Sequence, residues 1–242
     1  PGPQFNCTMA VDRQNRWPLW YRTQPVALPD IATLNTAATR VNDLGLDDVA
    51  YTFDRGYFSQ ANLAALLEQG LHFTIGIPLH LEQAEDLLQR HWQTLIAFKH
   101  AFLFQGAMVG HVPCVYTLKL PDGSDCRLAA HLYYHPERRE QLSARLGRAV
   151  LALRERASAE SFNTLAEGRH WLAENAGNYD KYFAVTKRAG KVTIQMIANR
   201  VELSSRKFGV TLIVTSVLAG SPHQPTRELV LAEYRGRELT DR

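Results

Sequence analysis

Several features that often identify a function are scarce or missing in this sequence. The three cysteines, Cys7, Cys114 and Cys126, are scattered and odd in number. They fit neither a disulfide framework nor a cysteine-based metal site, and they indicate a reducing compartment. There is no signal peptide and no apolar run long enough to span a bilayer. An α/β metabolic enzyme is one of three hypotheses for this chain, and it would call for a Gly-rich phosphate-binding loop after a strand. The sequence has no such loop, which argues against that hypothesis.

Charge and histidine are equally uninformative. The net charge of +3 and the pI near 8.9 permit a nucleic-acid partner without requiring one. The nine histidines show no metal-ligand spacing, which favours surface or packing roles. No Ser/His or Cys/His arrangement indicates a covalent nucleophile. At 242 residues and 45% hydrophobic, the chain can form one large domain or a domain with an insertion.

The most informative segment is an apolar run that ends in a carboxylate. Residues 49–53 are rich in β-branched and aromatic side chains without Gly or Pro, which predicts a strand. Asp54 follows, Gly56 permits a tight turn, and Ser59 is a good N-cap for a helix that ends near Gly70. Open α/β sheets place ligands at the carboxyl ends of their strands. The alternative, and the commoner role for such an aspartate, is to hydrogen-bond its own turn.

The remaining elements are predicted from periodicity and turn signals. The segments 5–11 and 17–23 predict a hairpin, Asp30 begins a helix to about Leu44, and residues 49–77 form a parallel βαβ unit. These four strands are expected in one sheet. Later elements are a helix over 81–92, paired strands 112–120 and 127–134, a long helix from Pro136, a hairpin of 182–186 and 192–196, a strand 211–215 and a last helix from about 225. The arginines of the long helix are interpreted as a solvated face balanced by glutamates rather than a DNA-binding stripe.

Four blocks in this order resemble DDE-type insertion-sequence transposases. The segment Asp54-Arg55-Gly56-Tyr57-Phe58-Ser59, with 62–67 and 73–78, is similar to the second-aspartate block of that family. Residues 18–22 and 29–34 resemble the strand and helix upstream of it, and 133–139 a block of the inserted region. Tyr234-Arg235-Gly236-Arg237 is similar to the start of the Y-x2-R-x3-E-x6-K helix signature.

The resemblance implies an α/β fold with a ribonuclease H-like mixed sheet, interrupted by an α+β insertion. Residues 1–78 would be the first part of the catalytic core, 79–223 the insertion, and 224–242 a C-terminal helix that returns to the core. Both ends are expected to be truncated, because the chain starts at Pro1 and stops at Arg242 within a helix.

The resemblance also implies the site. Asp54 would be the second catalytic carboxylate, and Asp241 falls where the family has its glutamate. Together they would hold Mg²⁺ or Mn²⁺, two cations in the intact family, with their carboxylates within roughly 10 Å of each other. Glu238 lies one turn earlier, but the spacing favours Asp241. Tyr234 and Arg237 would bind a DNA phosphate from one helix face.

Two residues of the family pattern have no match: the first catalytic aspartate, and the lysine of the helix signature, which falls past Arg242. The first catalytic aspartate precedes the strand matched by residues 5–11, and Asp12 aligns with a non-catalytic strand end. The strand that carries it would lie between 5–11 and 49–54, so the facing edges of both are expected to be unpaired.

The implied function is cutting and joining DNA at insertion-sequence ends, impaired in this chain. The alternative is a non-catalytic remnant that binds DNA or a full-length transposase. The implied partner is double-stranded DNA at transposon ends, a homodimer is allowed, no membrane is involved, and the location is cytoplasmic and nucleoid-associated in a bacterium.

Overall fold

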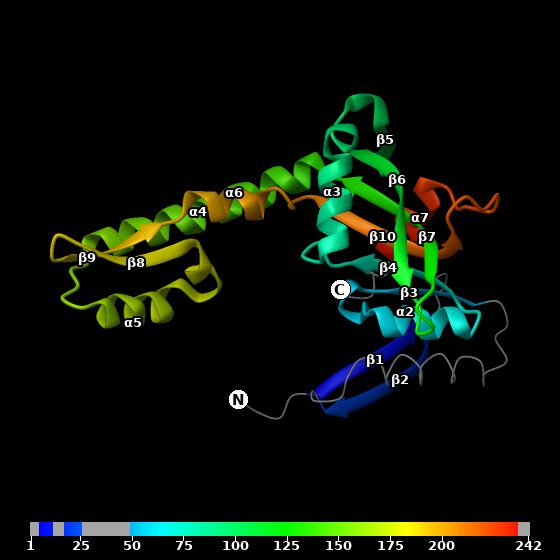
Figure 1. Cartoon of the computed structure of the whole chain (residues 1–242), viewed down its shortest axis with the longest axis horizontal. Helices are drawn as coiled ribbons and strands as arrows, with labels where there is room; N and C mark the ends of the chain where they lie inside the picture. Colours follow the sequence, from blue (N-terminus) through cyan, green and yellow to red (C-terminus); the bar gives the residue numbers. More distant parts are fainter. Residues whose placement is uncertain (1–4, 12–16, 26–48, 237–242) are drawn as a thin grey trace. The chain divides into compact units, whose positions relative to one another are not determined.

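The computed structural model describes residues 5–11, 17–25 and 49–236 (Figure 1). The helix expected between Asp30 and Leu44 lies outside these residues. So do Asp12 and two of the expected site residues, Arg237 and Asp241.

The chain divides into two compact units. Unit 1 consists of Pro1–Tyr133 and Thr211–Arg242, and unit 2 of Tyr134–Val210. The sequence predicted an insertion over 79–223, and these bounds stay a prediction. Strands from within that range belong to the main sheet of unit 1. Only 134–210 forms a unit of its own.

Unit 1 is built on a mixed six-stranded sheet of order β3-β4-β10-β7-β6-β5. An α/β fold with a mixed sheet was predicted, and the structure confirms it. The strands are β3 Ala50–Phe53, β4 His72–Ile77, β5 Ala101–Phe104, β6 Ala107–Lys119, β7 Asp125–Tyr134 and β10 Val210–Leu218; the helices are α2 Gln60–Glu68, α3 Glu82–Leu95 and α7 Arg227–Gly236.

The predicted βαβ unit is present. β3 and β4 are parallel, with Phe53 paired to Ile75, and α2 connects them. Ser59 is the N-cap of α2, since its hydroxyl accepts a hydrogen bond of 3.0 Å from the N–H of Asn62. Gly56 lies in a 3-10 turn without a positive φ and with open space around it, so this turn does not require glycine.

The N-terminal hairpin differs from the prediction. β1 Phe5–Val11 and β2 Pro18–Pro25 pair antiparallel, as expected, but they form a separate two-stranded sheet. The prediction that these strands share a sheet with β3 and β4 was therefore wrong. The physical reason is that β1 and β2 pair with each other along the hairpin, so their backbone groups on that side are satisfied without β3. β3 is at the end of the six-stranded sheet, and none of the described strands pairs with its outer edge.

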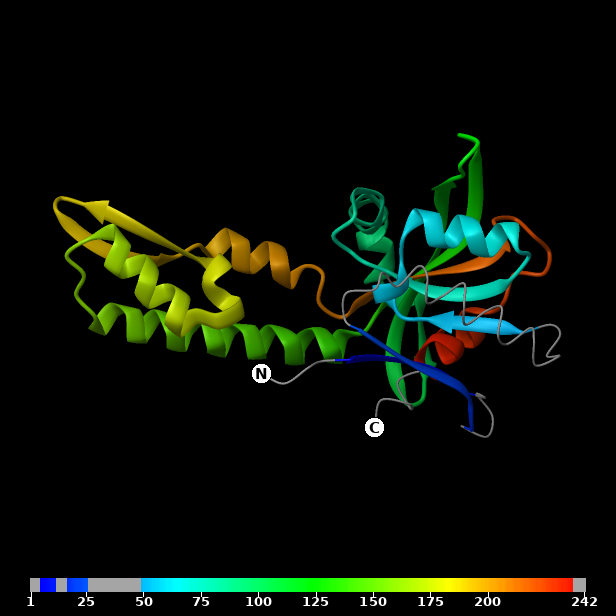
Figure 2. The ribbon, with the colours of Figure 1, turned by 90° about the horizontal axis from the view of Figure 1, so that it is seen from below.

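The two faces of the sheet are covered by different helices. Side chains alternate along a strand, so Thr74 and Gly76 of β4 face α7, whereas Phe73, Ile75 and Ile77 point the other way. α2 lies on that second side and α7 on the first (Figure 2). The core beneath α7 consists of Phe102, Phe104, Val109, Tyr133, Ile213, Val230, Leu231 and Tyr234.

Unit 2 contains the long helix predicted from Pro136. Its elements are α4 Pro136–Ala159, α5 Leu165–Ala176, β8 Phe183–Arg188, β9 Lys191–Met196 and α6 Ala198–Ser205. The hairpin of β8 and β9 is also as predicted, and it packs against α4 and α5. The core between them is apolar: Leu146, Val150, Leu153, Ala157, Leu172, Ala176, Tyr182, Phe183 and Ile194.

Candidate functional site

Asp54 follows directly after β3, where the sequence predicted it. Its Oδ1 accepts a hydrogen bond of 2.7 Å from the N–H of Arg55, and it caps the 3-10 turn Arg55–Tyr57. The side chain is exposed. Asp54 thus has the ordinary role of an aspartate in a turn, and it also presents a carboxylate at the carboxyl end of a parallel strand.

Tyr234 is the second site residue that the structure describes. It lies on α7 and is 4% exposed within the core that α7 forms with the sheet. Its ring fills the space beside Gly76 of β4: a Cβ on Gly76 would overlap the phenol oxygen and come within 2.7 Å of Cζ. The packing role considered for this tyrosine is therefore present. The contact with a DNA phosphate remains a prediction.

The register of the sheet brings Asp54 and Tyr234 to the same end of two neighbouring strands. Phe53 pairs with Ile75, so Asp54 and Gly76 are each one residue further along parallel strands. α7 packs against both β3 and β4, and its Tyr234 lies on Gly76. The last helix therefore passes over the sheet beside the strand end that carries Asp54.

A second carboxylate reaches this face of the sheet from α7. Oγ1 of Thr74 donates a hydrogen bond of 3.1 Å to Oε2 of Glu233, and Thr74 is 5% exposed. Sequence reasoning missed Glu233. It lies outside the helix signature that begins at Tyr234, and no other pattern in the sequence distinguishes it from a surface glutamate.

The carboxylates that the structure describes do not by themselves form a metal site. Among the described residues there is no group of three or more His, Cys, Asp or Glu side chains able to hold an ion. Asp54 is one candidate ligand. The expected pairing of Asp54 with Asp241 involves a residue outside the described part of the chain.

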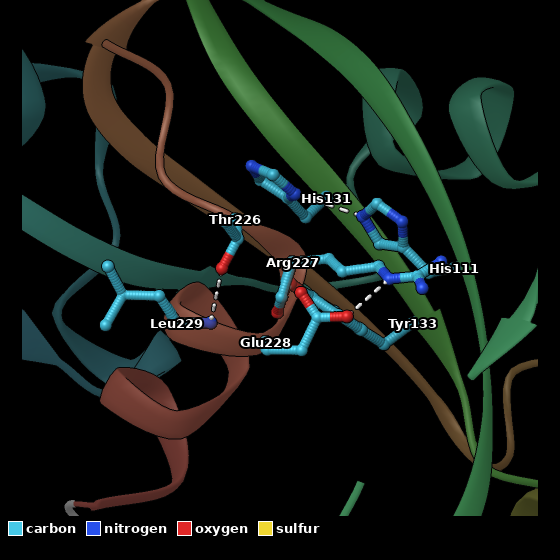
Figure 3. A network of polar contacts seen from close by, with 7 residues as sticks. All are labelled: His111, His131, Tyr133, Thr226, Arg227, Glu228 and Leu229. Atoms are coloured by element: carbon cyan, nitrogen blue, oxygen red, sulfur yellow. Dashed lines mark hydrogen bonds and ion pairs between the residues drawn. The ribbon is translucent and has the colours of Figure 1, made fainter. Parts of the chain in front are cut away.

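A buried histidine pair lies on the same face, beneath the start of α7 (Figure 3). His111 of β6 and His131 of β7 are 8% and 4% exposed, and Nε2 of His111 is 3.0 Å from Nδ1 of His131. One nitrogen must donate and the other accept, so this bond needs neutral imidazole on the accepting side. Burial lowers the pKa of His131 to about 4. Burial, then the charges of His131 and Arg227, lower the pKa of His111 to about 3.

The polar contacts around this pair attach α7 to the sheet. The hydroxyl of Tyr133 donates a hydrogen bond of 2.8 Å to the carbonyl of Arg227, the first residue of α7. The guanidinium of Arg227 lies 4.4 Å from the ring centroid of Phe102, and its Nε is 2.7 Å from Oε1 of Glu228. The hydroxyl of Thr226 accepts a hydrogen bond of 3.2 Å from Leu229 N–H, which satisfies one free donor of the first turn.

These contacts were not predicted, although packing roles were among those expected for the histidines. The available signal was weak: His131 alternates with Ala129 and Tyr133 on one side of a predicted strand, a pattern that places a polar ring on an apolar face.

No described helix has both the length and the apolar character needed to cross a membrane. Comparisons of the chain with protein-family models, with curated proteins and with solved structures give no match.

Proposed function

We propose that this chain is part of the catalytic core of a DDE-type transposase, which cuts and joins DNA at the ends of an insertion sequence. The observation that carries the proposal is the position of Asp54. It is exposed at the carboxyl end of a parallel strand, and the helix that carries Tyr234 packs on the neighbouring strand. Both residues come from blocks in which the sequence resembles the family.

The open edge of β3 supports the same proposal. In a ribonuclease H-like sheet, the strand with the first catalytic aspartate would separate β1 from β3. Here β1 and β2 form their own sheet, and β3 is an edge strand. The free edge of β3 is what we expect from such a sheet without its central strand, and it supports the ribonuclease H-like assignment without depending on Asp54. The separate sheet of β1 and β2 was not expected and adds no support.

The proposed site combines described and undescribed residues. Asp54 and Asp241 would bind Mg²⁺ or Mn²⁺, and Tyr234 and Arg237 a phosphate of the DNA. When bound, two such cations activate the attacking oxygen and stabilise the leaving oxygen at phosphorus. The resemblance assigns only two of the three carboxylates to this chain. We therefore propose that its strand-transfer activity is strongly impaired, because two-metal catalysis depends on accurate positioning.

The test is to incubate the purified chain with Mn²⁺ and DNA that carries the element's ends, in parallel with Asp54→Asn. We expect little or no strand transfer by either protein. Efficient joining by the unmodified chain would show that another residue supplies the third carboxylate, with Asp12 and Glu238 as the candidates.

The alternative is a non-catalytic remnant that binds DNA or a full-length transposase. DNA binding that is unaffected by EDTA and by Asp54→Asn, together with no cleavage under any metal condition, would support the alternative over a catalytic role.

A further inference from the structure

Positive charge is concentrated in unit 2. Residues 134–210 contain fourteen Lys and Arg against eight Asp and Glu, a net charge of +6, whereas the rest of the chain has a net charge of −3. The overall value of +3 conceals this difference. A basic segment of this kind can attract a polyanion even when the whole chain is close to neutral.

The densest group of cations in unit 2 is at the tip of the β8–β9 hairpin. Lys187, Arg188 and Lys191 fall within five residues, and all three are exposed. Arg188 pairs with Lys191 across the hairpin, so these two side chains leave adjacent strands at the same level. No described carboxylate forms an ion pair with any of the three. Like charges opposite each other on a hairpin destabilise it, so their presence without counter-ions points to an anionic partner.

The tip projects from a firmly packed base. Along β8 the residues change from buried at Phe183 to exposed at Lys187, and the base of the hairpin packs on α4 and α5. A Cβ on Gly168 of α5 would come within 2.7 Å of Val185 Cγ1, so helix and strand are in close contact there. Only residues 187–191 extend beyond this packing.

The turn itself is tight. Ala189 and Gly190 form a two-residue loop, and both have positive φ, 47° and 79°. Positive φ at both central positions is characteristic of the type I′ turn, whose twist matches that of the two strands. The tip is therefore a narrow two-stranded ribbon rather than a broad loop.

We propose that this tip, residues 187–191, enters the major groove of duplex DNA and contacts its phosphates. The major groove of B-form DNA is wide enough for a two-stranded β-ribbon, whereas the major groove of A-form RNA is deep and too narrow for side chains to read. The positive charges of Lys and Arg at the tip complement the negative charges of the phosphates that line the groove. The tip carries no large apolar side chain that could enter a membrane.

DNA binding by the tip does not depend on the proposed catalysis, and its test needs neither metal nor the element's ends. Binding of the full chain to a fluorescein-labelled duplex of arbitrary sequence, about three helical turns long, is measured by anisotropy in EDTA at several salt concentrations. The test variant is Lys187→Ala/Arg188→Ala/Lys191→Ala. The matched control, Arg138→Ala/Arg145→Ala/Arg148→Ala, removes the same charge from exposed positions of α4 in the same unit.

We expect the tip variant to bind at least about tenfold more weakly and the α4 variant less than about threefold. The affinity of the tip variant should also depend less on salt. The slope of log binding constant against log salt concentration should become shallower by roughly 0.9 for each phosphate that the protein no longer neutralises. Lys187→Arg/Lys191→Arg, which keeps the charge, should bind as the unmodified chain does.

An equal reduction of affinity in both triple variants would overturn the proposal, because general charge would then explain binding. Equal or tighter binding to duplex RNA or to anionic vesicles would overturn it as well. Circular dichroism melting of each variant separates weaker binding by a folded protein from unfolding.

Discussion

The ring of Tyr234 occupies the space that a side chain at Gly76 would need. This contact joins the last helix to β4. Gly76 directly follows Ile75, which pairs with Phe53, the last residue of β3. A glycine is therefore required at residue 76 by close approach rather than by its φ angle.

Gly76→Ala should destabilise unit 1. The new methyl group would overlap the buried phenol, and overpacking of this kind costs about 1–3 kcal/mol. The measurement is the urea midpoint at constant m. Gly147→Ala is the control: Gly147 lies within α4 with open space around it, so the exchange should stabilise by up to about 1 kcal/mol. If both variants moved in the same direction, the contact between Tyr234 and Gly76 would be refuted.

Tyr133→Phe should loosen the start of α7. It removes the hydrogen bond to the carbonyl of Arg227 from a fully buried residue, at a cost of about 1–2 kcal/mol. Hydrogen exchange of the amides in α7 should accelerate. Tyr179→Phe provides a comparison within unit 2, where the hydroxyl has no described partner, and should change stability by less than about 0.5 kcal/mol. Unchanged exchange in α7 would mean that Tyr133 does not anchor the helix.

Acidification should destabilise unit 1 through His111 and His131. Their pKa values are lowered in the folded state to about 3 and about 4, below the ordinary value of 6.5. The unfolded chain therefore binds more protons, and stability falls as the pH drops from about 6.5 towards 4. Between pH 7 and pH 5, each imidazole should lower the free energy of unfolding by on the order of 2 kcal/mol.

The measurement is the free energy of unfolding from urea titrations at several pH values. His131→Phe should flatten this dependence, because it removes one of the two groups and the charge repulsion with the other. A pH profile as steep as that of the unmodified chain would show that the histidine pair is not its source.

The local elements could be predicted from the sequence because their signals are local. Ser59 before an apolar helix, Pro136 at the start of α4 and the turn at 120–124 each depend on nearby residues. The sheet order could not be predicted in the same way. Nothing in the alternating pattern of β1 and β2 distinguishes a strand that joins β3 from one that pairs only within its hairpin.

In the candidate site, too, the features with local sequence signals were predicted and those that depend on tertiary contacts were not. Asp54 was predicted because a strand, a carboxylate and a turn follow one another in sequence. Glu233 was missed because its partner is distant in the chain: Thr74 is 159 residues from Glu233. Contacts over such separations depend on how α7 crosses the sheet, which the periodicity of the helix does not reveal. His111 and His131 are only 20 residues apart, but the predicted strand 112–120 began one residue after His111, so their pairing was not predicted.

The most direct test of the central claim is Mn²⁺ binding by the full chain, measured by calorimetry or electron paramagnetic resonance. Asp54→Asn keeps an oxygen that can accept the hydrogen bond from Arg55 N–H but removes the charge. Asp122→Asn is the matched control, since Asp122 also accepts a backbone hydrogen bond in an exposed turn. A catalytic role for Asp54 predicts weak Mn²⁺ binding that Asp54→Asn abolishes and Asp122→Asn leaves intact. Binding that is the same in all three proteins would show that Asp54 serves only its turn.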